Sequence, residues 1–175
     1  LDGGRNKWEA EGKPLVIRPS RVCEGDITVS AADDSIRAFL PEVVELARSA
    51  NPGTQLVDIR SAAEFEGRII APDGVDELAV RAGHIPGAVN VSWGKAVRED
   101  GTFKSPEALR AIYAEAGVDG TAPIITYCRI GERSSHTWFA LNRILGYDVK
   151  NYDGSWTEYG NSVGVPVTNL AGTVW

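Results

Sequence analysis

Residues 122–141 read APIITYCRIGERSSHTWFAL, and three patterns follow one another in this stretch. The apolar run 122–127 is typical of a buried strand, and the polar segment 128–133 is typical of a loop. From Ser134 onward the pattern is helical. A strand that passes through a short loop directly into a helix is typical of α/β folds, so this stretch decides the predicted fold class.

Cys128 stands at the junction of the predicted strand and loop. The N-terminus of the following helix carries about half a positive charge, and Arg129 and Arg133 add to it. These charges favour thiolate over thiol, which is the state of a nucleophilic cysteine. We therefore predict Cys128 as the catalytic residue. The alternative is a buried cysteine that only closes a strand, since free cysteine is a frequent core residue.

The loop after Cys128 is the candidate binding segment. A loop with a glycine that leads into a helix forms a bowl of N–H donors, which could hold a phosphate or an anion bound to sulfur. In an acidic chain it would form a local cationic island. Its predicted substrate-binding residues are Arg129, Ile130, Gly131, Glu132 and Arg133.

The rest of the chain repeats the alternation of strands and helices. Such alternation predicts a central parallel sheet with helices on both faces, in which chemistry lies beyond the carboxyl ends of the strands. A helix over about 30–47 is expected, with Pro41 breaking or restarting it. Residues 68–83 are expected to form a loop. Further predicted strands are 55–60, 88–91 and 148–152, and further predicted helices begin at Ser105 and Ser134.

A short internal echo suggests the domain organisation. Residues 1–8, LDGGRNKW, resemble residues 152–159, YDGSWTEY, at an offset of 151 residues. Repeats at domain-sized spacing indicate duplication, although two chance Asp-Gly turns would give the same echo. We expect residues 1–20 to be the tail of a preceding, related domain plus a linker, and residues 21–175 to be the catalytic domain.

Composition excludes several classes of function. The net charge of −6 argues against nucleic acid as the main partner, and no apolar run is long enough for a membrane span. The two cysteines, Cys23 and Cys128, are not expected to form a disulfide, which favours a reducing, cytoplasmic location. With two histidines and no clustered cysteines, no metal site and no cofactor are expected.

Residues outside the loop have supporting roles in this interpretation. Asp58 and Arg60, at the end of the predicted strand 55–60, are expected to form a structural ion pair or hydrogen-bond network beneath the loop. His84 lies in a Gly-His-Ile-Pro-Gly turn, which its imidazole is expected to tie down rather than catalyse a reaction. Trp156 follows the turn 153–155 near the active edge of the sheet and is expected to be a core residue or to line the wall of the pocket.

The length of the loop separates two kinds of chemistry. Cysteine-dependent phosphatases and arsenate reductases place five residues between the cysteine and an arginine, which makes a cradle for a tetrahedral oxyanion. Here four residues separate Cys128 from Arg133. The shorter loop favours a single extra sulfur atom over a phosphoryl group.

Four ordered motifs then resemble the rhodanese family. They are Leu56–Arg60 with Glu64–Gly67, Gly83–Asn90, Tyr127–Gly131 and Tyr152–Trp156. The resemblance runs from about residue 30 to 167 and is specifically to the catalytic C-terminal half of a two-domain bacterial thiosulfate sulfurtransferase.

That resemblance implies a rhodanese-like α/β domain that moves a sulfane sulfur from thiosulfate to cyanide or a thiol acceptor through a Cys128 persulfide. It also implies that residues 1–20 are the tail of an inactive N-terminal rhodanese domain, and that this domain is a partner. Arg129 and Arg133 would attract the dianionic donor and stabilise the sulfite that leaves. The chain departs from the vertebrate pattern at Glu64, where an arginine is usual, and at Ile130, where a lysine is usual. Open alternatives are a 3-mercaptopyruvate sulfurtransferase, a cysteine-dependent phosphatase or arsenate reductase, and a non-catalytic sulfur-carrier module.

Overall fold

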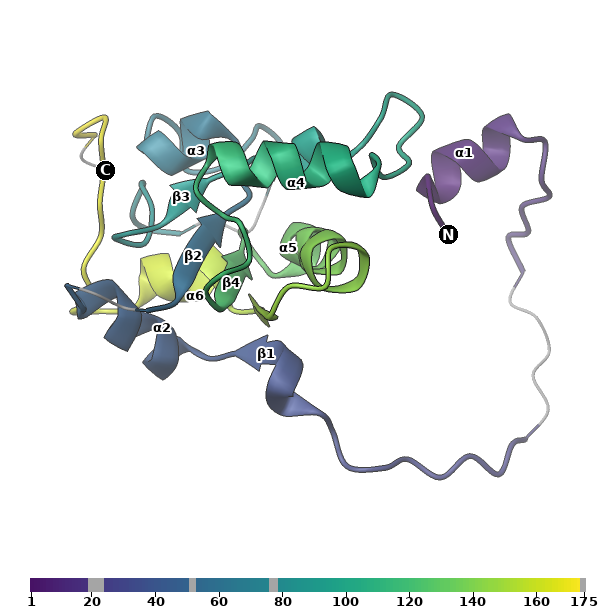
Figure 1. Ribbon diagram of the computed structural model, residues 1–175, viewed down its shortest axis with the longest axis horizontal. Helices are drawn as coiled ribbons and strands as arrows, with labels where there is room; N and C mark the ends of the chain where they lie inside the picture. Colours follow the sequence, from purple (N-terminus) through teal and green to yellow (C-terminus); the bar gives the residue numbers. More distant parts are fainter. Residues whose placement is uncertain (19–23, 51–52, 76–78, 174–175) are drawn as a thin grey trace.

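A five-stranded, all-parallel sheet forms the centre of the protein (Figure 1). The computed structural model describes residues 1–18, 24–50, 53–75 and 79–173. The strands are β1 (Arg37–Ala38), β2 (Gln55–Asp58), β3 (Val89–Asn90), β4 (Ile124–Tyr127) and β5 (Val149–Tyr152), in the spatial order β1-β5-β4-β2-β3. The predicted fold class is therefore confirmed, and β4, which leads to Cys128, is the central strand.

Helices cover both faces of this sheet. The helical elements are α1 (Gly4–Ala10), η1 (Asp34–Ile36), α2 (Leu40–Arg48), α3 (Ala62–Glu66), η2 (Trp93–Ala96), α4 (Pro106–Glu115), α5 (Glu132–Trp138), the π-helical segment η3 (Phe139–Ile144) and α6 (Ser155–Asn161). None of the helices in the described ranges is long and apolar enough to cross a membrane.

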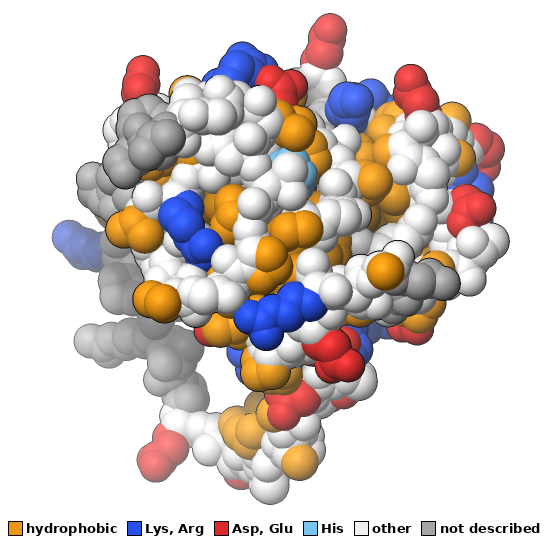
Figure 2. Space-filling model, turned by 90° about the vertical axis from the view of Figure 1, so that its left-hand side faces the viewer, with side chains coloured by type: hydrophobic (Ala, Val, Ile, Leu, Met, Phe, Trp, Pro, Cys, Tyr) orange, Lys and Arg blue, Asp and Glu red, His pale blue; other side chains and the backbone are white. Residues whose placement is uncertain are grey.

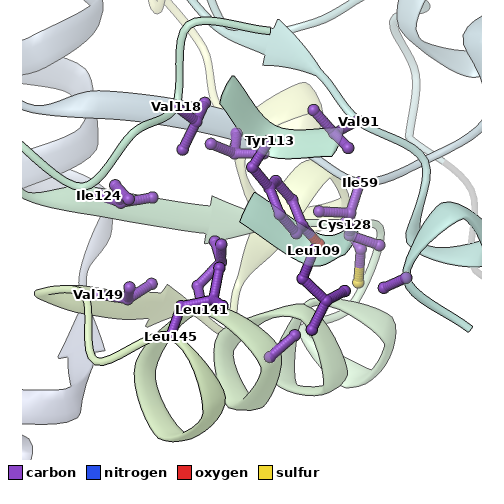
Figure 3. Close-up of a cluster of buried hydrophobic side chains, with 13 residues drawn as sticks. Ile59, Val91, Leu109, Tyr113, Val118, Ile124, Cys128, Leu141, Leu145 and Val149 are labelled. Atoms are coloured by element: carbon purple, nitrogen blue, oxygen red, sulfur yellow. The ribbon is translucent and has the colours of Figure 1, made fainter. Parts of the chain in front are cut away.

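The side chains of β4 alternate between two hydrophobic cores. Ile124, together with Cys128 just past the strand, packs in the core beneath α4, α5 and η3 (Figure 3). Ile125 and Tyr127 pack in the opposite core with residues of α2 and α6. The period of two residues places both faces of the strand in protein, as expected for a parallel sheet covered on both sides.

The helix predicted over 30–47 is only half correct. Residues 34–36 form the single turn η1, whose Asp33 side chain accepts a hydrogen bond from the Ser35 N–H at 3.0 Å. The chain then enters the edge strand β1, which the sequence did not predict. A helix restarts at Leu40 with Pro41 in its first turn, where the missing N–H of proline costs nothing.

The helix after the cysteine loop begins earlier than expected. α5 starts at Glu132 rather than Ser134 and continues without interruption into η3, ending at Ile144. Residues 68–75 and 79–83 contain neither helix nor strand, so the predicted loop is confirmed wherever the structure describes it.

The two echoed segments adopt similar local structures. α1 begins at Gly4 and α6 begins at Ser155, and these residues occupy equivalent places in the echo. Both have a left-handed backbone, with φ of 60° at Gly4 and 51° at Ser155. Ser155 is the one non-glycine residue with positive φ in the described part of the chain. The prediction that residues 1–20 are the tail of a related domain thus remains a hypothesis, with a matching pair of helix starts in its support.

Candidate active site

Cys128 lies at the carboxyl end of the central strand and is completely buried. Its side chain belongs to the core cluster that also contains Ile59 and Leu109 (Figure 3). The backbone of Cys128 is held by the start of α6: its N–H donates to Ser155 Oγ at 3.0 Å, and its carbonyl accepts from the Trp156 N–H at 3.1 Å. Because Cys128 has no exposed surface, a substrate can reach its sulfur only when the groups that cover it move.

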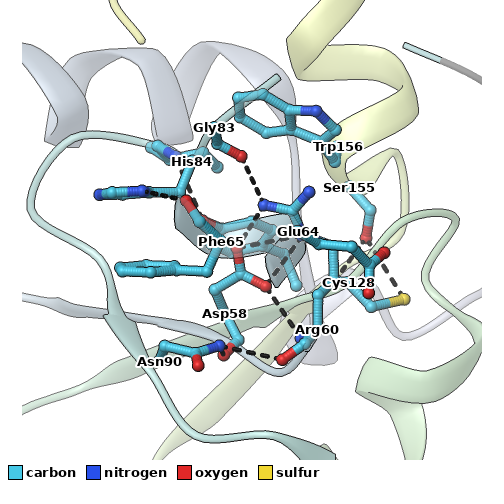
Figure 4. Close-up of polar contacts among 12 residues, drawn as sticks. Asp58, Arg60, Glu64, Phe65, Gly83, His84, Asn90, Cys128, Ser155 and Trp156 are labelled. Carbon is cyan, nitrogen blue, oxygen red and sulfur yellow. Dashed lines mark hydrogen bonds and ion pairs between the residues drawn. The ribbon is translucent and has the colours of Figure 1, made fainter. Parts of the chain in front are cut away.

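Two serine hydroxyls lie next to the sulfur within this apolar core. Ser134 Oγ is 3.6 Å from Cys128 Sγ and 3.1 Å from the Gly131 carbonyl, so its single proton can be donated to either acceptor. Ser155 Oγ is 4.0 Å from Sγ and donates to the Tyr152 carbonyl at 2.7 Å (Figure 4). Because the Ser155 proton is directed at the Tyr152 carbonyl, Ser134 is the hydroxyl of this pair that can donate to the sulfur.

Gly131 sets the shape of the loop. It precedes the first residue of α5 and has φ of 84°, which glycine adopts without strain. A Cβ at this position would lie 2.7 Å from the Asp153 carbonyl oxygen and 2.8 Å from the Asp153 Cα. The loop therefore packs directly on the backbone of the turn between β5 and α6. The Thr157 N–H, which donates to the Arg129 carbonyl at 2.9 Å, ties the same two segments together.

The loop is less cationic than expected. Glu64, whose side chain is fully buried, accepts a hydrogen bond from Arg133 Nη2 at 3.3 Å. With Glu132 exposed on the same loop, the carboxylates of Glu64 and Glu132 balance the charges of Arg129 and Arg133. The prediction of a cationic island is wrong for this reason: a residue 69 positions away in the sequence neutralises Arg133.

The other loop residues differ in exposure. Arg129 is half-buried, Ile130 is 37% exposed, and Gly131 is buried. Arg133 retains 25% exposure of its side chain, so part of its guanidinium faces solvent. The predicted binding residues thus form the connection between Cys128 and the first turn of α5, and the Arg133 side chain is directed at Glu64.

Asp58 and Arg60 form a fully buried ion pair, which confirms the structural role predicted for them (Figure 4). Arg60 Nη2 lies 2.6 Å from Asp58 Oδ2 and also donates to the Gly83 carbonyl at 2.7 Å. Burial alone would lower the pKa of Arg60, but the charge and hydrogen bonds of Asp58 outweigh burial and raise it. Arg60 therefore stays charged, and it ties β2 to the turn before His84.

Trp156 is a core residue, which is the first of the two roles predicted for it. It is completely buried, with its ring 4.8 Å from the Arg60 guanidinium and its indole N–H donating to the Arg81 carbonyl at 2.9 Å. The cation over the ring links the ion pair of β2 to α6. Trp156 thus supports the site by fixing the helix whose first residue, Ser155, holds the backbone of Cys128.

His84 ties down its turn, as predicted. Its Nδ1 lies 2.7 Å from the Phe65 carbonyl, and its ring stacks on Phe65 with centroids 3.7 Å apart. Its backbone pairs with Thr168 as an isolated antiparallel bridge. Burial lowers the pKa of His84, with the Phe65 carbonyl opposing this shift. The described interactions of His84 are those of a structural residue.

Sequence reasoning missed Glu64 and Ser155 as parts of the site. The signal for Glu64 was present, since Ser61-Ala-Ala-Glu64 is a capping-box pattern. The structure contains that box at the start of α3, with Ser61 Oγ and Glu64 Oε2 2.8 Å apart. For Ser155 the only signal in the sequence is its place after an Asp-Gly turn. Its left-handed backbone and its bond to Cys128 require the folded structure.

The described residues contain no candidate metal site and do not include Cys23. No group of three or more His, Cys, Asp or Glu side chains suited to a metal occurs among residues 1–18, 24–50, 53–75 and 79–173. Cys23, to which no role was assigned, lies outside the described residues.

The chain is similar to proteins of known families. A model of the rhodanese-like domain matches residues 42–162. The chain is 54% identical over 169 residues to a "Putative thiosulfate sulfurtransferase" of Mycolicibacterium smegmatis, covering 95% of this chain and 60% of that protein. It is 51% identical over 170 residues to the sulfur carrier protein TtuD of Thermus thermophilus, with the same coverage. The chain thus spans about 60% of the length of these curated relatives.

Solved structures confirm the fold at greater distance. The chain superposes on the anaerobic ergothioneine biosynthesis enzyme of Chlorobium limicola with a TM-score of 0.79 at 24% identity, covering 97% of this chain and 40% of that one. At this identity the similarity concerns the arrangement of strands and helices.

Proposed function

The chain belongs to the rhodanese-like domain family, and from this premise we propose that it transfers a sulfane sulfur from thiosulfate to cyanide or a thiol through a persulfide on Cys128. The observation that carries the proposal is the placement of Cys128. It lies directly after the central strand, and the hydroxyls of Ser134, in α5, and of Ser155 lie 3.6 and 4.0 Å from its sulfur. These groups would stabilise negative charge on a sulfur, first as the thiolate and then as the persulfide.

The proposed reaction has two displacements on sulfur. The Cys128 thiolate attacks the outer sulfur of thiosulfate, a new S–S bond forms, and the S–S bond of thiosulfate breaks with its electron pair leaving on sulfite. The acceptor then attacks the outer sulfur of the persulfide. Its bond to Cys128 breaks, and the electron pair returns to regenerate the thiolate. With cyanide as acceptor the product is thiocyanate, and no outside oxidant or reductant is required.

Each arginine has a proposed place in the first displacement. Arg129 and the exposed part of Arg133 would bind the sulfonate end of thiosulfate and stabilise the charge that moves onto sulfite. The N–H groups at the first turn of α5 lack partners within the helix and would donate to the outer sulfur. Ser134 would donate to Cys128 Sγ once a negative charge develops there.

Turnover with competing donors tests this proposal. We expect thiocyanate to form from cyanide with thiosulfate as donor, more efficiently than with 3-mercaptopyruvate, because two arginines favour the dianion. Cys128→Ser should abolish the reaction and keep the fold, as judged by circular dichroism. Preference for 3-mercaptopyruvate would support the alternative sulfurtransferase. Retained turnover in Cys128→Ser would refute the mechanism. The assay should be run on this chain and on a longer protein that includes the preceding domain.

A sulfur-carrier role is the second candidate. It is favoured by the name of the Thermus thermophilus relative and by the complete burial of Cys128, which suits a persulfide shielded from small acceptors. A carrier would load from thiosulfate in one equivalent and then release sulfur to a protein thiol much faster than to cyanide. A sulfurtransferase of the first type would turn over many equivalents of cyanide.

A further inference from the structure

Glu64 is a carboxylate built into the wall of the cysteine site. Its side chain is fully buried, and its Oε2 atom accepts hydrogen bonds from the Ser61 N–H at 3.1 Å and the Ser61 hydroxyl at 2.8 Å. These bonds belong to the capping box of α3, so the start of that helix fixes the position of the carboxylate. Only Oε1 remains directed at the loop, and it meets Arg133 Nη2 at 3.3 Å.

The fixed position of Glu64 has an electrostatic consequence. Screening by solvent is weak for a buried charge, so Glu64 acts on any anion that Arg133 binds. The Coulomb energy between Glu64 and a bound donor is proportional to the charge of the donor. A dianion is therefore repelled with twice the energy of a monoanion in the same position. The charge of Glu64 therefore multiplies the dissociation constant of a monoanion by some factor, and it multiplies the dissociation constant of a dianion by the square of that factor.

We propose that Glu64 is a specificity-determining residue, which positions Arg133 at the mouth of the loop and lowers the preference of the site for dianionic over monoanionic sulfur donors. This inference deepens the proposed sulfur transfer and rests on it. The charge of Glu64 would keep the site from binding divalent oxyanions such as sulfate tightly. It would also leave the site open to donors with a single charge.

The test compares two donors that react by the same chemistry. Thiosulfate carries two negative charges, and methanethiosulfonate carries one; both give up an outer sulfur and release a sulfur oxyanion. Glu64→Gln removes the charge and keeps a side chain that the capping box accepts at this position. We expect KM to fall about tenfold for thiosulfate and about threefold for methanethiosulfonate, with kcat changed by less than about twofold.

Glu66→Gln is the matched control. Glu66 lies on the same helix, its side chain is 40% exposed, and it pairs with Arg68, so this variant removes the same charge where solvent screens it. In this control, the ratio of the KM for thiosulfate to the KM for methanethiosulfonate should stay within about twofold of the ratio in the parent protein. An unchanged ratio in Glu64→Gln, or a lower kcat with both KM values unchanged, would overturn the inference and assign Glu64 a structural role.

A binding measurement separates this inference from the proposed function. The rate of Cys128 alkylation by iodoacetamide can be followed with increasing sulfate or methanesulfonate, neither of which transfers sulfur. Glu64→Gln should strengthen protection by sulfate about threefold more than protection by methanesulfonate. If the parent protein does not turn over thiosulfate, but Glu64→Gln still strengthens protection by sulfate more than protection by methanesulfonate, the proposed function is refuted and the role of Glu64 is upheld. Equal strengthening for both anions would refute that role alone.

Discussion

Gly131→Ala is the substitution whose effect the structure defines best. The residue has φ of 84°, where a side chain costs about 1–2 kcal/mol, and alanine recovers about 0.4–1 kcal/mol by restricting the unfolded chain. The new Cβ would also lie 2.7 Å from the Asp153 carbonyl oxygen. That contact is with backbone and cannot be relieved by rotating a side chain, so overpacking adds about 1–3 kcal/mol. We expect a total loss of about 2–4 kcal/mol in the free energy of unfolding.

Gly117→Ala isolates the contribution of the contact. Gly117 has φ of 76°, but an added Cβ would meet nothing within 4 Å. It should therefore lose only about 1 kcal/mol, from backbone strain alone. Urea denaturation followed by tryptophan fluorescence gives both free energies on one protein scaffold.

Activity should separate the two variants further. In Gly131→Ala the loop must move away from Asp153, and a shift approaching 1 Å at a reacting group costs about 10²-fold in rate. Gly117→Ala should keep parental thiocyanate production. Equal losses of stability and activity in the two variants would refute the claim that close packing on Asp153 shapes the loop.

Three further predictions concern groups around the site. Arg60→Leu should lower the free energy of unfolding by about 3–5 kcal/mol, because it leaves the buried Asp58 carboxylate unpaired. Adding Asp58→Asn to the same chain should recover part of this loss in urea denaturation, and no recovery would contradict the ion-pair account. Ser155→Gly should be about 1 kcal/mol more stable than Ser155→Ala, since only alanine keeps the strain at φ of 51°, and equal denaturation midpoints would argue against that strain. Burial lowers the pKa of both His84 and His136, so the unfolded chain binds more protons than the folded chain near pH 6.5. The free energy of unfolding should therefore fall as the pH drops through this value, and it should level off below the lowered pKa values of the folded state. Denaturation midpoints that stay flat from about pH 7.5 to 5 in the parent but slope in His136→Phe would contradict this.

The central part of the fold could be predicted because its signals are local. The apolar run before Cys128, the glycine in the loop and the helical pattern after it place β4 and α5 with small errors at their ends. The ion pair of Asp58 and Arg60 could also be predicted, because an unpaired charge at the end of a buried strand is strongly destabilising.

The missed features depend on contacts between distant segments. β1 is two residues long and exists through its pairing with β5, where Arg37 aligns with Asn151, more than 100 positions away. No local pattern encodes such a pairing, and the helical spacing around it gave the wrong prediction. The neutralisation of Arg133 by Glu64 is missed for the same reason: composition counts charges but does not say which ones meet.

Burial of the cysteine is the point at which sequence and structure differ most for function. The sequence favoured a nucleophile in a cationic loop over a core cysteine, whereas the structure encloses Cys128 in an apolar core with two serine hydroxyls nearby and an arginine paired with Glu64. On the face drawn in Figure 2, Lys and Arg side chains are scattered among hydrophobic ones. At the cysteine loop, the charge of Arg133 is balanced by its pairing with the buried Glu64.

Intact-protein mass spectrometry after incubation with thiosulfate tests the central claim most directly. The account predicts that the parent and Cys23→Ser proteins each gain one sulfur atom, that cyanide removes it as thiocyanate, and that Cys128→Ser gains none. A sulfur that appears on Cys128→Ser, or no added sulfur on the parent protein with or without the preceding domain, would contradict a persulfide on Cys128.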